Sequence, residues 1–292
     1  MKAFIFPGQG SQFSGMGFDL YQKNEKAKSL FHTANDILKF NITKIMFEGS
    51  EEDLKQTNVT QPAIFIHSTI LAKCINNFMP DMVAGHSLGE FSALVATNVL
   101  SFEDGLKLVM KRAELMHIAC QEHSSTMAAI IGLDTETINK TCELTDGIVV
   151  PANYNSPGQI VISGNRKSIE NACSTLSELG AKRAVILPVA GAFHSPLMSS
   201  AEEELEEAIN KIQFNKPICP IYQNVCAKGI LIENELKQNL IKQLTAPVKW
   251  QQTIEHMIHE GATEFFEVGP GNVLTGLNRR INRVIPSNKV HI

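Results

Sequence analysis

The chain has 292 residues, of which 43% are hydrophobic and 19% are charged, and its formal net charge is −4. These values are typical of a soluble globular protein with one large domain, or with a main domain and a smaller one attached, and they leave no basic stripe of the kind that binds nucleic acid. No apolar run is long enough to span a bilayer, and the first one, Ala3–Phe6, is too short for the core of a signal peptide, so we expect a cytoplasmic protein that acts away from membranes.

Residues 1–124 alternate between short apolar runs and helical segments, which predicts a parallel sheet wrapped by helices. The predicted strands are Ala3–Phe6 and Met82–Ala84. The predicted helices are Lys26–Leu38, Gln61–Asn76 with Pro62 in its first turn, Leu88–Thr97, and a helix that a capping box at Ser101 opens and that ends near Gln121.

Residues 125–189 have a different rhythm. We predict strands at Thr126–Ile131, Ile148–Asn153, Gln159–Ser163 and Lys182–Pro188, and helices at Thr135–Leu144 and Arg166–Leu179, the second capped by Asn165 and stopped by Gly180. Asn155-Ser156-Pro157-Gly158 is a strong turn signal between two of the strands. The order β-α-β-β-α-β with a central hairpin predicts a small ferredoxin-like domain inserted into the large one.

Residues 190–292 return to the first pattern, so we expect them to complete the large domain that residues 1–124 begin. The predicted elements are helix Pro196–Ile212, strand Ile218–Asn224, helices Glu235–Leu244 and Gln251–Glu260, strand Glu264–Val268 and helix Asn272–Arg280. The inserted domain would leave a cleft between the two units, and such junctions often bind ligands. Ser87 and the segment that follows the insertion would face this cleft.

Six cysteines are scattered through the chain, and none of them forms a Cys-x-x-Cys pair: Cys74, Cys120, Cys142, Cys173, Cys219 and Cys226. This spacing argues against a zinc knuckle and against a thioredoxin-like motif. In a chain of this length it indicates reduced, mostly buried thiols.

The segment Gly85-His86-Ser87-Leu88-Gly89-Glu90 has a Gly-x-Ser-x-Gly pattern between a predicted strand and a predicted helix. A nucleophile elbow needs this order, because its glycines allow a sharp turn that exposes the serine hydroxyl at the positive end of a helix. Ser87 is therefore a candidate nucleophile in an α/β-hydrolase-like large domain. The pattern also fits an ordinary strand-to-helix turn in which a serine caps the helix.

A serine needs a base at neutral pH, and nine histidines are available. His86 adjoins Ser87, but its side chain should point away from the turn, which favours a structural role. His256 and His259 match no metalloprotease motif, and we expect them to be solvated on a helix. His194 lies in a loop of small residues just before a helix that starts with proline, where the chain re-enters the large domain. It is the candidate base.

Two further features have two interpretations each. The loop Gly8–Gln12 lacks the third glycine of a dinucleotide-binding loop, and it offers either backbone amides for an oxyanion hole, together with the amide of Leu88, or a plain turn. Arg112 falls on the shoulder of the apolar face of its helix. Its periodicity favours a surface arginine with a partly buried stem, and the alternative is a guanidinium turned into the cleft to hold a carboxylate.

Several motifs in the same order resemble the malonyl-CoA:acyl carrier protein transacylases, a family of acyltransferases in fatty acid biosynthesis. The resemblance covers nearly the whole chain and rests on Gly8–Gln12, Val59–Ala63, Gly85–Glu90, Arg112, Asn155–Gln159, Ile162–Gly164, Gly191–Met198, Pro247–Trp250 and Glu267–Leu274. Ala192 is a small departure, because many relatives have proline there.

The resemblance implies a ping-pong transfer of the malonyl group from malonyl-CoA, through an ester on Ser87, to the phosphopantetheine thiol of an acyl carrier protein. In this reading His194 is the base and Gln9 and Leu88 supply the oxyanion-hole amides. The remaining roles are a carboxylate-binding Arg112 beside Gln61, a selectivity-determining Phe193, a substrate-binding Asn155 and a backbone carbonyl near Gln243 that orients the histidine.

The same resemblance implies no cofactor and no metal, since malonyl-CoA is a substrate, and the partners that it implies are CoA thioesters and the carrier protein. We expect a monomer. Two alternatives stay open from the sequence. A serine esterase or thioesterase could use the same elbow and would not need Arg112, and an acyltransferase of the same chemistry could serve a polyketide carrier protein. A third alternative is a non-catalytic docking module of a synthase complex.

Overall fold

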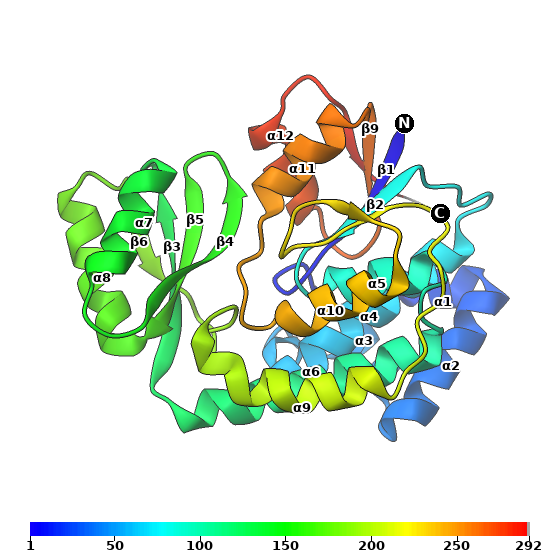
Figure 1. Ribbon diagram of the computed structural model, residues 1–292. Helices are drawn as coiled ribbons and strands as arrows, with labels where there is room; N and C mark the ends of the chain where they lie inside the picture. The colour runs from blue at the N-terminus through cyan, green and yellow to red at the C-terminus, as the bar shows by residue number, and fades with distance from the viewer. Residues whose placement is uncertain (291–292) are drawn as a thin grey trace.

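The computed structural model describes residues 1–290 and arranges their strands in two sheets (Figure 1). The larger sheet has the order β10-β9-β1-β2-β7-β8. Its strands are β1 (Lys2–Phe6), β2 (Met82–Gly85), β7 (Ile221–Tyr222), β8 (Gly229–Ile230), β9 (Glu264–Glu267) and β10 (Ser287–Lys289). The pairs from β10 to β7 are parallel, and β8 folds back antiparallel onto β7, so this sheet is mixed rather than purely parallel.

Helices cover both faces of the larger sheet. Successive side chains of β1 point to opposite faces of the sheet. Phe4 and Phe6 belong to one apolar cluster, and Ala3 and Ile5 belong to another, so both faces are covered. The helices of this part are α1 (Phe18–Lys23), α2 (Glu25–Leu38), α3 (Ile42–Glu48), α4 (Thr57–Cys74), α5 (Gly89–Ala96), α6 (Phe102–Glu122), α9 (Ser199–Asn210), α10 (Glu233–Lys242), α11 (Trp250–His259) and α12 (Val273–Ile281), with 3₁₀ turns at Asp53–Lys55 and Pro196–Met198.

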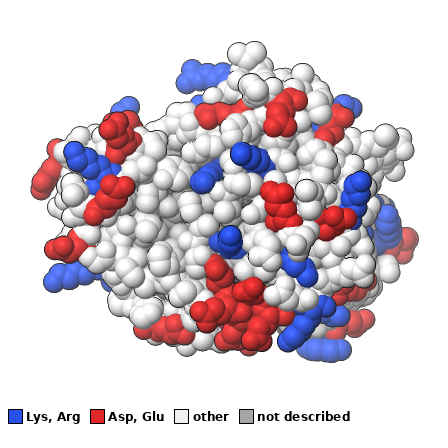
Figure 2. Space-filling model, viewed as in Figure 1, with Lys and Arg blue, Asp and Glu red and all other residues white. Residues whose placement is uncertain are grey.

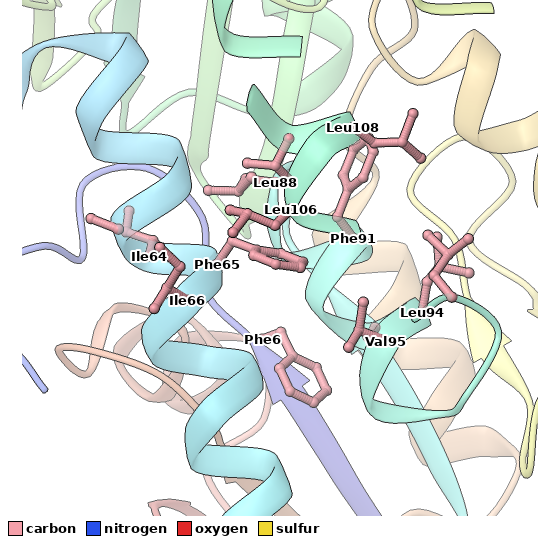
Figure 3. Close-up of a cluster of buried hydrophobic side chains, with 14 of the residues drawn as sticks. Phe6, Ile64, Phe65, Ile66, Leu88, Phe91, Leu94, Val95, Leu106 and Leu108 are labelled. Atoms are coloured by element: carbon pink, nitrogen blue, oxygen red, sulfur yellow. The ribbon is translucent and has the colours of Figure 1, made fainter. Parts of the chain in front are cut away.

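The most buried helices, α4 and α5, pack against each other, and α5 lies against β1 and β2. Figure 3 shows Phe65 of α4 and Phe91 of α5 in one apolar cluster with Phe6 of β1. Leu88, which follows Ser87 in the chain, is buried in the same cluster. The backbone next to the candidate nucleophile is therefore held by close packing rather than by a solvent-exposed loop.

The smaller sheet has the order β4-β5-β3-β6, and all of its pairs are antiparallel. Its strands are β3 (Ser125–Ile131), β4 (Val149–Ser156), β5 (Gln159–Asn165) and β6 (Arg183–Ile186), and α7 (Thr135–Leu144) and α8 (Arg166–Glu178) pack against it (Figure 1). This unit has an apolar core of its own, which includes Ile130, Ile162 and Ile169.

The loop before α11 connects the two sheets. Val248 forms a parallel bridge with Asn153, its N–H donates to the Ala152 carbonyl at 2.8 Å, and its carbonyl accepts from the Tyr154 N–H at 2.9 Å. The small sheet therefore holds this loop in place through β4.

The structure corrects several predicted boundaries. The helix predicted to begin at Gln61 begins at Thr57, so Pro62 lies inside α4 rather than in its first turn. Strand β4 continues through Asn155 and Ser156, which leaves Pro157 and Gly158 as the turn. Asn165 makes no capping hydrogen bond to α8, because its Oδ1 accepts from the Ile148 N–H at 2.9 Å.

Other differences concern short elements. The strand predicted at Ile218–Asn224 is reduced to Ile221–Tyr222, and the helix predicted at Pro196–Ile212 is a 3₁₀ turn followed by α9. The two short helices α1 and α3 and the strands β8 and β10 were not predicted. Within residues 1–290, no helix is both long and apolar enough to cross a bilayer.

Candidate active site

The strand, turn and helix predicted around Ser87 are present. Ser87 lies between β2 and α5 with φ of +50°, a conformation in which a residue with a side chain is strained. A Cβ on Gly85 would lie 2.0 Å from the carbonyl carbon of Gly89, and a Cβ on Gly89 would lie 2.0 Å from the Phe6 oxygen. Both positions therefore require glycine, and the turn is a nucleophile elbow in its geometry.

His194 meets Ser87 across 107 positions of the chain, with 2.7 Å between its Nε2 and the Ser87 Oγ. Its Nδ1 lies 2.9 Å from the Gln243 carbonyl oxygen and 3.2 Å from that of Ala246. Carbonyls only accept, so Nδ1 carries the proton and Nε2 is left to accept from the serine hydroxyl. The structure thus puts a backbone carbonyl of Gln243 where the resemblance implied it, and Ala246 adds a second one.

The charge state of His194 suits a base. Burial, followed by the positive charge of Arg112, lowers the pKa of His194 to about 3. The imidazole is therefore neutral at physiological pH, with Nε2 ready to take a proton.

Arg112 is buried, with 1% of its surface exposed, so the surface interpretation favoured by helical periodicity is wrong. Its Nη1 donates to the Gln61 Oε1 at 2.7 Å, and its Nη2 donates to the Ser87 Oγ at 3.0 Å and to the Gln243 Oε1 at 3.3 Å. The shoulder of α6 faces α4 and the elbow rather than solvent. Periodicity identifies the buried face of one helix, but it does not show what packs against its edge.

The N–H groups of the Arg112 guanidinium are not all hydrogen-bonded. Its Nε has no hydrogen-bond partner, and within residues 1–290 no carboxylate oxygen lies within 4.0 Å of it. Burial lowers its pKa to about 10, so the group stays charged at pH 7. The charge of Glu90 opposes this effect without a direct contact. A desolvated guanidinium that forms no ion pair is costly, and its fork matches a carboxylate. These features suit a carboxylate beside the serine, and the carboxylate-binding role of Arg112 stays a prediction.

The N-terminal loop touches the elbow. A Cβ on Gly8 would lie 2.5 Å from the His86 carbonyl oxygen. The backbone of Gly8 therefore packs closely against the elbow, and Gln9 is the next residue in the chain. Neither the Gln9 N–H nor the Leu88 N–H donates to another group in the described part of the chain. This arrangement suits the predicted oxyanion hole, which stays a prediction.

Asn155 reaches the elbow through His86. The Asn155 Oδ1 lies 2.9 Å from the His86 Nε2, and the His86 ring packs against Trp250 with 5.5 Å between centroids. His86 therefore has a structural contact, as expected, and Asn155 makes no hydrogen bond to Ser87 or to Arg112. Phe193, next to the candidate base, is buried at 6% exposure.

The second histidine pair lies away from these contacts. His256 and His259 are on the exposed side of α11, and the His256 Nδ1 bonds the Ala227 carbonyl at 2.7 Å. Over residues 1–290, no group of three or more histidine, cysteine or acidic side chains could hold a metal ion.

The comparisons with known proteins agree with this geometry. Residues 3–284 match the family described as the acyl transferase domain. The chain belongs to the acyl transferase family. This acyl transferase is 43% identical over 284 residues to the malonyl CoA-acyl carrier protein transacylase of Staphylococcus aureus (strain MRSA252), an alignment that covers 96% of this chain and 92% of the relative.

Solved structures agree with the assignment of this acyl transferase. An acyl carrier protein S-malonyltransferase from Vibrio cholerae superposes with a TM-score of 0.95 at 39% identity, covering 99% of this chain and 96% of that one. A malonyl-transacylase solved in complex with its type II PKS acyl-carrier protein has a TM-score of 0.94 at 38% identity, covering 99% and 95%. The α/β fold, with its mixed sheet and helices, is thus shared across the full length.

Sequence reasoning missed Asn224, which holds the backbone of the elbow in this acyl transferase. Its Oδ1 accepts from the Ser87 N–H at 2.7 Å, and its Nδ2 donates to the Gly85 carbonyl at 2.6 Å. A signal was available, because Asn224 follows β7, the parallel neighbour of β2, and the carboxyl ends of parallel strands meet at one edge.

We expect Asn224→Ala to slow acylation of Ser87 and to destabilise the fold. The substitution leaves the Ser87 N–H and the Gly85 carbonyl without their partners, each at a cost of about 1–3 kcal/mol. Thermal unfolding and the acylation rate measured on one preparation test this. A matched control is Asn35→Ala, a partly buried asparagine whose Nδ2 donates to the Thr43 Oγ1 and whose Oδ1 accepts from the Thr43 N–H, away from the elbow. Equal acylation rates in the two variants would contradict the role of Asn224.

Proposed function

We propose that this chain transfers the malonyl group of malonyl-CoA to the phosphopantetheine thiol of an acyl carrier protein, as an acyltransferase of fatty acid biosynthesis. The names of its relatives support this function. One observation of its own site carries it: the Oγ of Ser87 contacts both a neutral imidazole and a buried guanidinium that has no carboxylate partner of its own. A nucleophile beside an unpaired cation fits an acyl group that ends in a carboxylate.

In the first half-reaction, the Ser87 Oγ attacks the thioester carbonyl of malonyl-CoA while the His194 Nε2 takes its proton. The tetrahedral oxyanion would be held by the amides of Gln9 and Leu88, and losing one such donor typically costs about 10²–10³ in rate. The intermediate collapses when the C–S bond breaks, and His194 returns the proton to the departing CoA thiolate. The product is a malonyl ester of Ser87.

In the second half-reaction, the carrier's phosphopantetheine thiol gives its proton to the His194 Nε2 and attacks the ester carbonyl. The C–O bond to Ser87 breaks, and the serine oxygen recovers the proton from His194. Atoms and charge balance without ATP, a metal or a redox cofactor. Every group used belongs to one chain, so we propose that a monomer suffices.

The carrier protein is the partner that this function requires, and one structural relative was solved with its carrier bound. Figure 2 shows acidic side chains gathered along the lower edge of the viewed face, over α9, which holds five glutamates (Glu202, Glu203, Glu204, Glu206 and Glu207). Like charges repel, so an acidic carrier would dock away from α9. Because that relative's carrier belongs to polyketide synthesis, the test includes a polyketide carrier beside a fatty acid carrier.

We also propose a finer description of the fold. The strand order β4-β5-β3-β6 with two helices supports a ferredoxin-like small domain over residues 125–189. The residues on either side of it would form one discontinuous, α/β-hydrolase-like catalytic domain, as the elbow between β2 and α5 suggests. Limited proteolysis that removes the small unit intact would support this division.

The proposed function predicts a covalent intermediate. After mixing with malonyl-CoA, the intact protein should gain the mass of one malonyl group on Ser87. Adding a fatty acid holo-carrier protein should remove it and malonylate the carrier faster than a polyketide holo-carrier protein does. Carrier protein without its phosphopantetheine arm is the control and should leave the ester in place. A wild-type protein that hydrolyses malonyl-CoA and never malonylates a carrier would instead be a thioesterase.

A further inference from the structure

Glu90 is a fully buried acid in the first turn of α5, three residues after Ser87, and the mechanism above does not use it. A buried carboxylate is costly unless hydrogen bonds and nearby charge compensate it. What surrounds Glu90 therefore indicates why an acid is placed there.

Three donors and no acceptor face the Glu90 carboxylate. Its Oε1 accepts from the Gln223 Nε2 at 3.0 Å, and its Oε2 accepts from the Asn224 N–H at 3.2 Å and from the Gln243 Nε2 at 2.7 Å. An ionised carboxylate accepts at all of these positions, whereas an amide would point its NH₂ group at a donor, and the proton of a neutral acid would find no acceptor among these three groups. The network thus favours the anion.

Gln243 connects this network to the reacting groups. Its Nε2, which donates to Glu90, also donates to the Ser87 carbonyl at 2.9 Å. Its Oε1 therefore faces the other way, 3.3 Å from the Arg112 Nη2. Rotating this amide by 180° would point its NH₂ group at the guanidinium, which is itself a donor and cannot accept a hydrogen bond. Glu90 also accepts from the Asn224 N–H, and the Asn224 side chain bonds the Ser87 N–H and the Gly85 carbonyl of the elbow.

We propose that Glu90 is a positioning residue whose carboxylate, together with the Ser87 carbonyl, sets the amide orientation of Gln243, and so keeps an acceptor, rather than a donor, in front of Arg112. Through Asn224 it fixes the elbow as well. This inference rests on the proposed function, because the orientation of Arg112 matters for an acyl group that carries a carboxylate.

The charges around Glu90 make this role dependent on pH. Burial raises the pKa of Glu90 to about 7, against the opposing effects of its three hydrogen bonds and of Arg112 on α6. Cys226, after β7, is the other titratable group it influences, and burial first and then the Glu90 charge raise the pKa of that thiol. His194, beyond Gln243, has a pKa of about 3 and stays neutral near pH 7. The anionic, functional form of Glu90 is therefore present above about pH 7 and is lost as the pH falls through that value.

The test compares Glu90→Gln and Glu90→Asp with the wild type, using kcat/KM for malonyl-CoA and for acetyl-CoA from pH 5 to 9. In the wild type we expect the malonyl-to-acetyl ratio to fall as the pH drops through about 7. Glu90→Gln should lower the ratio roughly ten- to a hundredfold above pH 7 and should flatten its pH profile. Glu90→Asp, which keeps a carboxylate, should recover part of the ratio and the pH dependence.

Glu267→Gln is the matched control, because Glu267 is another fully buried carboxylate with backbone donors, the N–H groups of Leu274 and Thr275 at 3.0 and 2.8 Å. It should lower thermal stability and leave the malonyl-to-acetyl ratio unchanged. A purely structural Glu90 would behave in the same way.

Two results would overturn the inference. One is a Glu90→Gln variant with the wild-type ratio and pH profile, and the other, which holds even if that variant does not fold, is a wild-type ratio that stays flat from pH 5 to 9. Either result leaves the proposed function standing as long as wild-type Ser87 is malonylated. Absence of that ester in the wild type would instead reject the proposed function.

Discussion

Ser87→Ala should abolish malonyl transfer to the carrier, with a loss of about 10⁴–10⁶-fold as for other enzymes that lose a serine nucleophile. Without the Oγ, no oxygen remains at the point where the His194 Nε2 and the Arg112 Nη2 converge. The variant should fold, because alanine removes no backbone contact and the Asn224 bond to the elbow uses the residue 87 N–H. Intact mass after malonyl-CoA treatment and the rate of carrier malonylation measure the effect.

Ser92→Ala is the matched control for this experiment. Ser92 lies on α5, is fully buried, and its hydroxyl has no hydrogen-bond partner. Removing such a hydroxyl is neutral or stabilising, so this variant should keep wild-type transfer. Carrier malonylation that survives in Ser87→Ala, with an adduct on another residue, would refute the elbow as the site of chemistry.

The elbow could be predicted from the sequence because its cause is local. Gly85 and Gly89 are needed at a turn that the flanking strand and helix already specify, and the structure places backbone atoms 2.0 Å from where each Cβ would be. The strands and helices of residues 125–189 were predictable for a similar reason, because strand and helix periods alternate within a short span of chain.

The short elements were not predictable, because tertiary contacts form them. Helix α1 has six residues, too few to be stable alone. Its Tyr21 packs against Phe31 of α2 and Phe47 of α3, with ring centroids 6.0 and 5.3 Å away. No local sequence pattern predicts an aromatic cluster to which three separate helices contribute.

The way the site residues come together was also not predictable from local sequence patterns. The pattern around His194 identifies a candidate, but its 2.7 Å contact with Ser87 depends on how the chain returns after the small sheet. Resemblance to a family supplied the pairing before the geometry did. The carbonyl of Ala246 belongs to a loop whose position follows from β4, so no spacing rule could assign it. Asn224 was within reach only once β7 was recognised as the parallel neighbour of β2.

Arg112→Ala should separate malonyl transfer from acetyl transfer. A hydrogen bond to a charged group is worth about 1.5–3 kcal/mol, so kcat/KM for malonyl-CoA should fall roughly ten- to a hundredfold relative to acetyl-CoA. The acetyl group carries no carboxylate and should be transferred at an equal or higher rate, since the buried cation beside Ser87 is gone. Both rates are measured with one carrier protein, and the acyl-Ser87 mass identifies which group was loaded.

Lys111→Ala is the control, because it removes the neighbouring cation of α6 from the surface, where Lys111 pairs with Glu204 at 3.4 Å. Exposed pairs of this kind contribute about 0–1 kcal/mol, so the malonyl-to-acetyl ratio should not change. Arg112→Lys should fall between the two, since it keeps a charge but loses the fork that fits a carboxylate. If Arg112→Ala turned over malonyl-CoA as fast as the wild type, the buried guanidinium would have no part in recognising the acyl group, and a serine esterase would explain the site better.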